Sequence, residues 1–291
     1  MEKKKNKFLS NKGFVIFSIL ALLIVMTAIC APLICGDRSP TAGSLADAIK
    51  APSAEHPFGT DKMGRDIFAR VIYGSRASLS STFLLVLTIF TVGAFLGVVA
   101  GYFGGWVDAV IMRIADMMIA FPGLVLAIAV AGMLGASTRN AVIAISVVSW
   151  PKYARLARSL VMKIRHTDFV AAAIVTGSKT PYMLARYMFP NTITTLVITA
   201  ATDIGSMMME LAALSFLGFG AQPPTPEWGS MLNEGRNFMQ SAPWMMIYPG
   251  LAIFTDSCFC AEEIAHLVRS EKVTALPHPL SDGICRALLG G

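Results

Sequence analysis

Two pairs of charged residues stand in apolar stretches of this chain, where a charge is rare and usually has a purpose. Arg113 and Asp116 lie one helical turn apart, a spacing at which opposite charges on one helix face neutralise each other. Asp203 and Glu210 lie two turns apart in a later apolar stretch. Because a carboxylate that faces hydrocarbon costs several kcal/mol, we expect these acids to face a cavity or a partner helix. All four are candidates for lining a substrate path, and structural pairing is the alternative.

The motifs of enzymes and of metal sites are missing. Gly177-Ser178-Lys179-Thr180 looks like the end of a phosphate-binding loop, but Ser178 separates the glycine from the lysine, and Ala172 stands where the first glycine belongs. The four histidines are scattered, the five cysteines have no metal-site or disulfide spacing, and no nucleophile elbow occurs. We therefore expect no catalytic residue, no metal and no cofactor, and any uphill transport must draw its energy from a partner or an ion gradient.

Composition indicates that most of these residues lie in lipid. The 291 residues are 55% hydrophobic and only 14% charged. Two charge-free runs, 13–36 and 77–107, exceed the ~20 residues that cross a membrane as a helix. Lipid offers no hydrogen-bond partners, so a segment that crosses it must pair its backbone groups internally, as a helix does. The sequence predicts an all-α polytopic membrane protein with about six spans. These are 14–35, which is too long for a cleaved signal peptide, then 79–101, 109–132, 138–160, 191–217 and 243–254.

The distribution of charge predicts the orientation. A net charge of +6 invites a nucleic-acid function, but the cations gather in the first 13 residues and between Lys152 and Arg186, as expected of cytoplasmic segments. The sequence therefore predicts a cytoplasmic N-terminus (1–13), an extracytoplasmic segment (36–78), and a permease core (79–254) with a cytoplasmic loop (161–190). We expect no nucleic-acid partner. Lys152, Arg155 and Arg158 are interpreted as reaching toward lipid phosphates or water at the membrane surface.

Within the loop 161–190, the residues predict two short helices that lie under the membrane. Thr167 caps the first, Gly177 ends it in a left-handed conformation, and Thr180 caps the second. Pro190 is expected to bound the second helix before the fifth span. The first helix offers a small and apolar surface, which suits insertion into a groove on a cytoplasmic partner.

The same loop carries a family resemblance. Ala171-Ala172-Ala173, Gly177 and Tyr187-x-Phe189-Pro190 resemble the EAA loop of ABC importer permeases, whose coupling helix docks into the ATPase subunit, although Ala171 stands where the family usually has Glu. Residues 56–79 (HPFGTDKMGRDIFARVIYGSRASL) and 214–229 (LSFLGFGAQPPTPEWG) look like the dipeptide, oligopeptide and nickel permeases, specifically the second permease of the pair. The resemblance covers about residues 1–254. By this resemblance, the ATPase-docking coupling helix comprises Phe169, Val170, Ala171, Ala172, Ala173, Gly177 and Pro190.

The resemblance also implies partners and a transport function. It implies a heterodimer with a second permease subunit, two cytoplasmic ATPase subunits that hydrolyse the ATP, and an extracytoplasmic substrate-binding protein, all at the inner membrane. The chain would form half of a translocation path for peptides or for nickel or a nickel chelate. Residues 150–161 and 203–218 favour the nickel-type members, and peptide remains open.

The tail of the chain differs in composition from the residues before it. Residues 255–291 change composition abruptly and bring Asp256, Glu262 and Glu263 into the place of the sixth span. This change indicates an altered reading frame near Thr255 and a truncated last helix.

Two other functions are alternatives to an ATP-driven permease. The first is a proton-coupled secondary transporter that uses Asp116, Asp203 and Glu210 as a relay. A membrane-embedded enzyme is the second, but too few polar residues cluster on facing spans to favour it.

Overall fold

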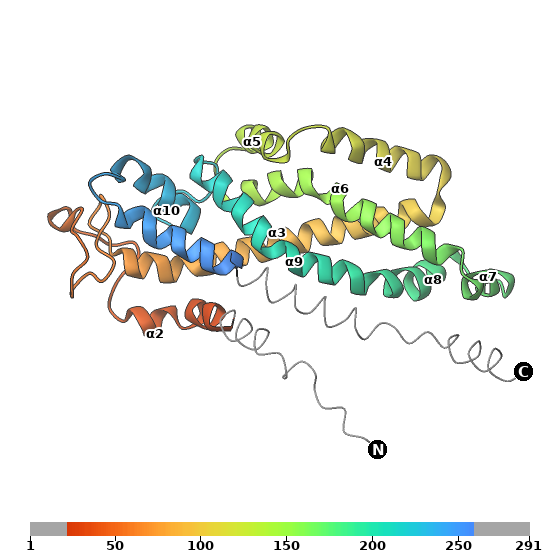
Figure 1. Cartoon of the computed structure of the whole chain (residues 1–291), viewed down its shortest axis with the longest axis horizontal. Helices are drawn as coiled ribbons and strands as arrows, with labels where there is room; N and C mark the ends of the chain where they lie inside the picture. The colour runs from red at the N-terminus through yellow and green to blue at the C-terminus, as the bar shows by residue number, and fades with distance from the viewer. Residues whose placement is uncertain (1–21, 259–291) are drawn as a thin grey trace, which may run out of the picture.

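The computed structural model describes residues 22–258 and shows an elongated bundle of helices (Figure 1). The predicted N-terminal segment 1–13, the start of the first span and most of the tail 255–291 lie outside the described residues. Residues 22–29 and 244–258 are helical. The other elements are α2 (Ala31–Cys35), η1 (Leu45–Asp47), α3 (Ile67–Phe103), α4 (Gly105–Ile119), α5 (Gly123–Leu134), α6 (Thr138–Arg165), α7 (Asp168–Val175), α8 (Thr180–Met183), η2 (Leu184–Met188), α9 (Phe189–Phe216), α10 (Trp228–Gly235) and η3 (Arg236–Phe238).

The predicted all-α class is confirmed for the described residues, which contain no strand longer than an isolated bridge. By length and apolarity, two helical stretches among them qualify as membrane spans, Ile67–Phe103 and Leu184–Phe216, and α4 with α5 makes a third if the bent pair counts as one. At 28 residues, α6 is also long enough to cross, but its basic residues lower its apolarity.

Two helices differ from the spans predicted from hydropathy, because a side-chain cap starts one of them earlier and a sharp bend divides the other. α3 begins at Ile67, twelve residues before the predicted span, because the Asp66 side chain accepts a hydrogen bond from the Ala69 amide and caps it. The predicted span 109–132 is two helices that meet at 94°, broken at Ala120–Pro122. Pro122 accounts for the break, since a proline removes a backbone donor and disfavours helix in the residue before it.

Pro190 does not end a helix, contrary to the sequence prediction. Helical structure is continuous from residue 180 to residue 216, through the π-helical turn η2, and Pro190 lies in the first turn of α9. A proline is tolerated there because the amides of a first turn need no partner within the α-helix. The last helix also runs farther than the predicted 243–254, since residues 255–258 are helical.

Glycines hold two long helices, α3 and α6, in close contact. A side chain at Gly93 would lie 2.5 Å from the Cβ atom of Tyr153, and one at Gly97 would lie 2.3 Å from the carbonyl oxygen of Ala154. Small residues at steps of four let two helix backbones approach, which is the usual basis of helix association in lipid. α3 and α6 therefore form the axis on which the other helices pack.

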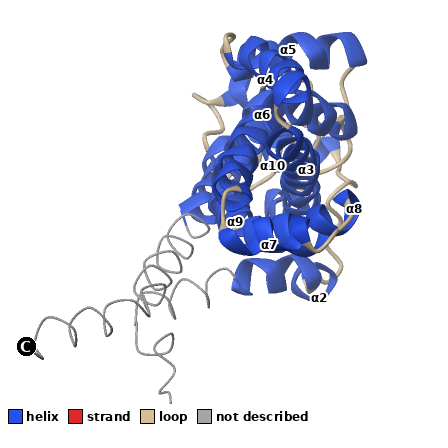
Figure 2. Ribbon diagram, turned by 90° about the vertical axis from the view of Figure 1, so that its right-hand side faces the viewer, coloured by secondary structure: helices blue, strands red, loops and turns tan. Residues whose placement is uncertain are grey.

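The remaining elements surround this axis and project beyond it at both ends. α2 and the α4–α5 pair lie on opposite sides of the central helices in both views (Figures 1 and 2). Residues 36–66 gather with α10 at one end, which we name the loop end, and α7 lies at the opposite end, which we name the α7 end (Figure 1). The main core combines buried residues of α3, α6 and α9, such as Ile89, Ile145 and Leu214.

Candidate functional site

Asp203 binds two side chains of α6 in the middle of the bundle. The ammonium group of Lys152 lies 2.7 Å from both carboxylate oxygens, and the hydroxyl group of Tyr153 donates to Oδ2 at 2.8 Å. Asp203 is buried, whereas the Lys152 side chain is 56% exposed. Asp203 therefore faces a partner helix, one of the two environments that the sequence analysis allowed.

Two further basic residues of α6 bind acids of α4. Arg155 pairs with Asp116, and Arg158 pairs with Asp108 through both the Nε and Nη2 atoms. The interpretation of Lys152, Arg155 and Arg158 as residues that reach for lipid phosphates or water was wrong, because each meets a carboxylate on a neighbouring helix. α6 thus carries a series of three cations that joins it to α9 on one side and to α4 on the other.

The predicted pairing of Arg113 with Asp116 does not form. Asp116 turns instead to Arg155, while Arg113 is exposed on α4 and has no ion pair among the described residues. Glu210 is half-buried on α9, and no hydrogen bond or ion pair joins it to another described residue. The four candidate path residues therefore divide into two that hold helices together and two whose charges remain available.

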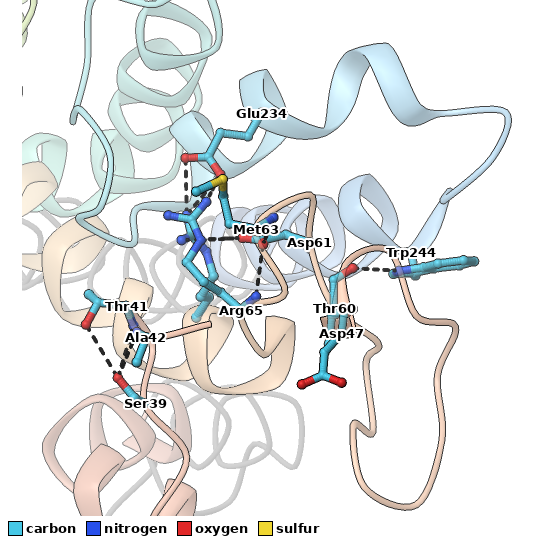
Figure 3. Close-up of polar contacts among 11 residues, drawn as sticks. Ser39, Thr41, Ala42, Asp47, Thr60, Asp61, Met63, Arg65, Glu234 and Trp244 are labelled. Carbon is cyan, nitrogen blue, oxygen red and sulfur yellow. Dashed lines mark hydrogen bonds and ion pairs between the residues drawn. The ribbon is translucent and has the colours of Figure 1, made fainter. Parts of the chain in front are cut away.

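At the loop end, the structure reveals a buried ion network that joins the predicted extracytoplasmic segment 36–78 to α10 (Figure 3). The Arg65 side chain donates to Asp61 and to Glu234, each at 2.6 Å. The guanidinium group of Arg70 lies 3.3 Å from Glu234 and 3.6 Å from Asp61. All four side chains are at most 9% exposed. The spacing of Asp61 and Arg65 was a signal, but Glu234 lies 169 positions later and no local pattern points to it.

Glu227 fastens α10 to α3 beside this network. Its carboxylate accepts hydrogen bonds from the amides of Gly229 and Ser230, at 2.9 and 2.8 Å, and from the hydroxyl group of Ser78 at 3.4 Å. Burial raises the pKa of Glu227 above its usual range, although these hydrogen bonds oppose the change. The indole of Trp228 donates to the carbonyl oxygen of Val71 at 2.9 Å. The motif at 214–229 therefore anchors the loop end.

At the opposite end, α7 turns one apolar edge inward and another outward. Val170 and Ala173 are buried, whereas Ala171 is exposed and Val175 is 87% exposed. The side chains of Phe169 and Ala172 lie outside what the structure describes. Of the predicted docking residues with described side chains, Val170 and Ala173 hold the helix in place, and Val175 is an outward residue that the sequence analysis missed.

Gly177 ends α7 in the way the sequence predicts. Its φ angle is +78°, and the amide of Ser178 donates to the carbonyl oxygen of Ala173 at 3.1 Å, which is the long hydrogen bond of a Schellman cap. Glycine adopts this backbone conformation without steric cost. The cap fixes where the short helix stops and where the chain turns back toward α8.

Comparison with known proteins places the chain among transport permeases. Residues 93–257 match the family described as binding-protein-dependent transport system inner membrane component. The dipeptide transport system permease protein DppC of Alkalihalophilus pseudofirmus is 43% identical over 84% of this chain and 80% of its own length. The glutathione transport system permease protein GsiD of Pectobacterium atrosepticum is 42% identical over 70% of this chain and 68% of its own.

A solved structure shares the fold. The crystal structure of an amino acid ABC transporter with histidines covers 70% of this chain and 95% of its own, with a TM-score of 0.54 and 18% sequence identity. The match in family and in length of alignment agrees with the helical architecture described above. This chain belongs to the family of binding-protein-dependent transport system inner membrane components, and it is a permease rather than an enzyme.

Proposed function

We propose that this permease forms one half of a path that imports small peptides with energy from ATP. The support is the substrate named for its relatives, dipeptide in one case and glutathione in another, at about 40% identity. The preference for nickel that residues 150–161 and 203–218 suggested gains no support from these relatives. A second permease subunit completes the path, a binding protein delivers the peptide, and two ATPase subunits supply the energy.

The observation that carries this proposal is the geometry of α7. It is a short helix at the end of the bundle, held by two buried residues and ended by a glycine cap, with Ala171 and Val175 directed away from the core. An exposed apolar edge on a helix suits a hydrophobic groove on another protein. We assign this edge to the ATPase subunit.

The connections of α6 suggest how movement of α7 reaches the helices in the membrane. Only two residues separate the end of α6 from the start of α7, so a displacement of α7 acts directly on α6. Through Arg155 and Arg158, α6 would carry α4 with it, and through Lys152 it would carry α9. Docking at one end is thereby converted into movement of the three helices together.

The path itself is assigned to the charges that the helices leave available. Arg113 and Glu210 face no partner among the described residues, and Lys152 is half exposed beside its partner Asp203. A peptide carries an ammonium and a carboxylate group, so charges of both signs along the path suit its passage. Under the proposed topology, the N-terminal lysines and α7 are cytoplasmic, and the loop end faces the binding protein.

The proton-relay alternative has less support. Asp116 and Asp203 each form an ion pair with a cation of α6, so these carboxylates join helices rather than standing unpaired along a path. The relatives also belong to systems that depend on a binding protein.

The test is an acidic substitution on the outward edge of α7. Val175→Asp places a charge on a surface that should meet an apolar groove, so we expect loss of ATPase co-purification and of peptide uptake. Membrane insertion should not change, because Val175 lies outside the core. The matched control for ATPase co-purification is Leu45→Asp, since Leu45 is also exposed (74%) but lies at the loop end, away from the proposed ATPase contact. Normal recovery of the ATPase with Val175→Asp would refute the assignment.

A further inference from the structure

A groove between α3 and α6 has the features of a ligand site that the transport function does not explain. Its volume is about 700 Å³. It is lined by Ser81, Leu84, Thr88 and Val92 of α3 and by Thr138, Arg139, Val142, Ile143, Ser146, Val147 and Trp150 of α6. Most of these side chains are apolar, and several polar groups interrupt them along the groove.

One buried polar group in the groove lacks a partner. Ser146 is 9% exposed, and its hydroxyl group makes no hydrogen bond to any described residue. The two hydroxyl groups that α3 contributes to the groove have partners, since Ser81 donates to the carbonyl oxygen of Ala77 and Thr88 to that of Leu84. A buried hydroxyl group without a partner costs about 1–3 kcal/mol in proteins, so an acceptor in the groove would stabilise Ser146 once rotation about χ1 turns its enclosed oxygen toward the groove.

The end of the groove at the start of α6 is positively charged. Arg139 lines it, is exposed, and forms no ion pair with a described residue. It lies in the first turn of α6, a 28-residue helix whose N-terminus adds partial positive charge. The Ser137 side chain already caps the Asn140 amide, so Arg139 is the group that remains available for an anion.

The length of the groove matches one leaflet of a bilayer. Arg139 and Trp150 are eleven residues apart on α6, which is about 16 Å at ~1.5 Å per residue. Half of a hydrocarbon core of ~30 Å is about 15 Å. The cation therefore lies at the depth of lipid phosphates when Trp150 lies near the middle of the bilayer.

We propose that this groove binds one anionic phospholipid, with its phosphate at Arg139, an acyl chain along Val142, Ile143 and Val147, and an ester oxygen as the acceptor for Ser146. Under the proposed topology this lipid belongs to the outer leaflet. Arg139 supplies the charge that complements the headgroup, and the apolar side chains of the walls suit an acyl chain.

The experiment measures lipid retention by the purified permease in complex with its partner subunits. The complex is supplied with equal amounts of phosphatidylglycerol and phosphatidylcholine in detergent, and bound lipids are counted by native mass spectrometry. We expect one tightly retained phosphatidylglycerol. Arg139→Gln should lower the preference for phosphatidylglycerol about fivefold, because one cation near an anionic headgroup contributes roughly 1 kcal/mol to binding. Arg236→Gln is the matched control, because Arg236 is also exposed but lies outside the groove.

A second variant tests the apolar part of the site. Val147→Trp fills the groove from its open side, since Val147 is 41% exposed, and should abolish retention of either lipid. Val197→Trp is its control on α9, where the residue is 49% exposed and outside the groove. The proposal is overturned if both groove variants retain phosphatidylglycerol as the unmodified complex does. It is equally overturned if a photocrosslinker at position 143 captures the second permease instead of lipid.

Discussion

The two ends of this permease are built on opposite plans. At the loop end, residues 36–66, α3 and α10 are joined by buried side chains that come from distant parts of the sequence, including the Asp61–Arg65–Arg70–Glu234 network. Phe58 also stacks on Tyr248 of the last helix, with ring centroids 3.9 Å apart. At the α7 end, the helix is anchored by Val170 and Ala173 and displays Val175 to its surroundings.

The difference separates the part of the molecule that keeps its shape from the part that awaits a partner. Charges that are removed from water are stabilising only when they are mutually paired, so the loop-end network fixes one arrangement of three segments. An exposed apolar edge gains its stabilisation only when another protein covers it. Substitutions at the loop end should therefore damage folding, and those at the α7 end should damage assembly.

The largest effect is expected from Glu234→Ala at the loop end. The substitution leaves the guanidinium groups of Arg65 and Arg70 buried beside a single carboxylate, and removal of one member of a buried ion pair costs about 3–5 kcal/mol. We expect a large fall in the thermal unfolding midpoint of the detergent-solubilised protein. Lys50→Ala, which removes the exposed pair with Asp47, is the control and should leave the midpoint unchanged. If both variants unfold like the unmodified protein, the loop end is not fastened by its charges.

A smaller change of opposite sign is expected at Asp256, where the last helix leaves the loop end and enters the bundle. Asp256 is 3% exposed, lines an apolar cavity with Ile24 and Ile204, and has a carboxylate oxygen without a hydrogen-bond partner. Asp256→Leu removes this unpaired group, so we expect the free energy of unfolding to rise by about 1–3 kcal/mol. The measurement is the same thermal transition in detergent.

Asp203→Leu is the matched control for Asp256→Leu, because it deletes a buried carboxylate that is paired with Lys152 and Tyr153. It should lower stability. A rise at position 256 would also agree with the hypothesis that the sequence from Thr255 onward is altered, since an apolar residue would then suit the fold better than the acid present. Destabilisation by Asp256→Leu would contradict the unpaired state of this carboxylate.

Local sequence signals were sufficient for much of the architecture and for α7. Charge-free runs indicate helices in lipid, and Gly177 ends α7 as predicted, because a left-handed turn depends on residues within one or two turns. The predicted side-chain cap by Thr167 is not what its hydroxyl group forms, since this group donates to the carbonyl oxygen of Ile164. The same locality explains the break at Pro122. Its severity was not predictable, because the 94° angle depends on how α5 packs on α6.

Side-chain partners were the part that sequence could not supply. Lys152, Arg155 and Arg158 have the same pattern whether they reach for lipid phosphates or for acids on other helices, and their partners lie 39 to 51 positions away. The side of α7 that faces outward was hidden for a related reason. Val170 and Val175 are equally apolar, so only the packing of the helix shows that one is buried and the other exposed.

The smallest effect on stability, with a large effect on assembly, is expected for Gly177→Ala. No atom lies within 4 Å of the position that a Cβ atom would occupy, so the cost comes from the φ angle of +78° alone and amounts to about 1 kcal/mol. To relieve it, the end of α7 must turn, which displaces Val175 from the proposed ATPase groove. We expect nearly normal thermal unfolding but reduced co-purification of the ATPase.

Gly177→Asn is the matched control, since asparagine tolerates the left-handed conformation and should retain more of the ATPase than alanine does. If alanine and asparagine retain the ATPase equally well, the direction in which α7 ends does not govern docking, and the contrast between a self-sufficient loop end and a partner-dependent α7 end loses its main support.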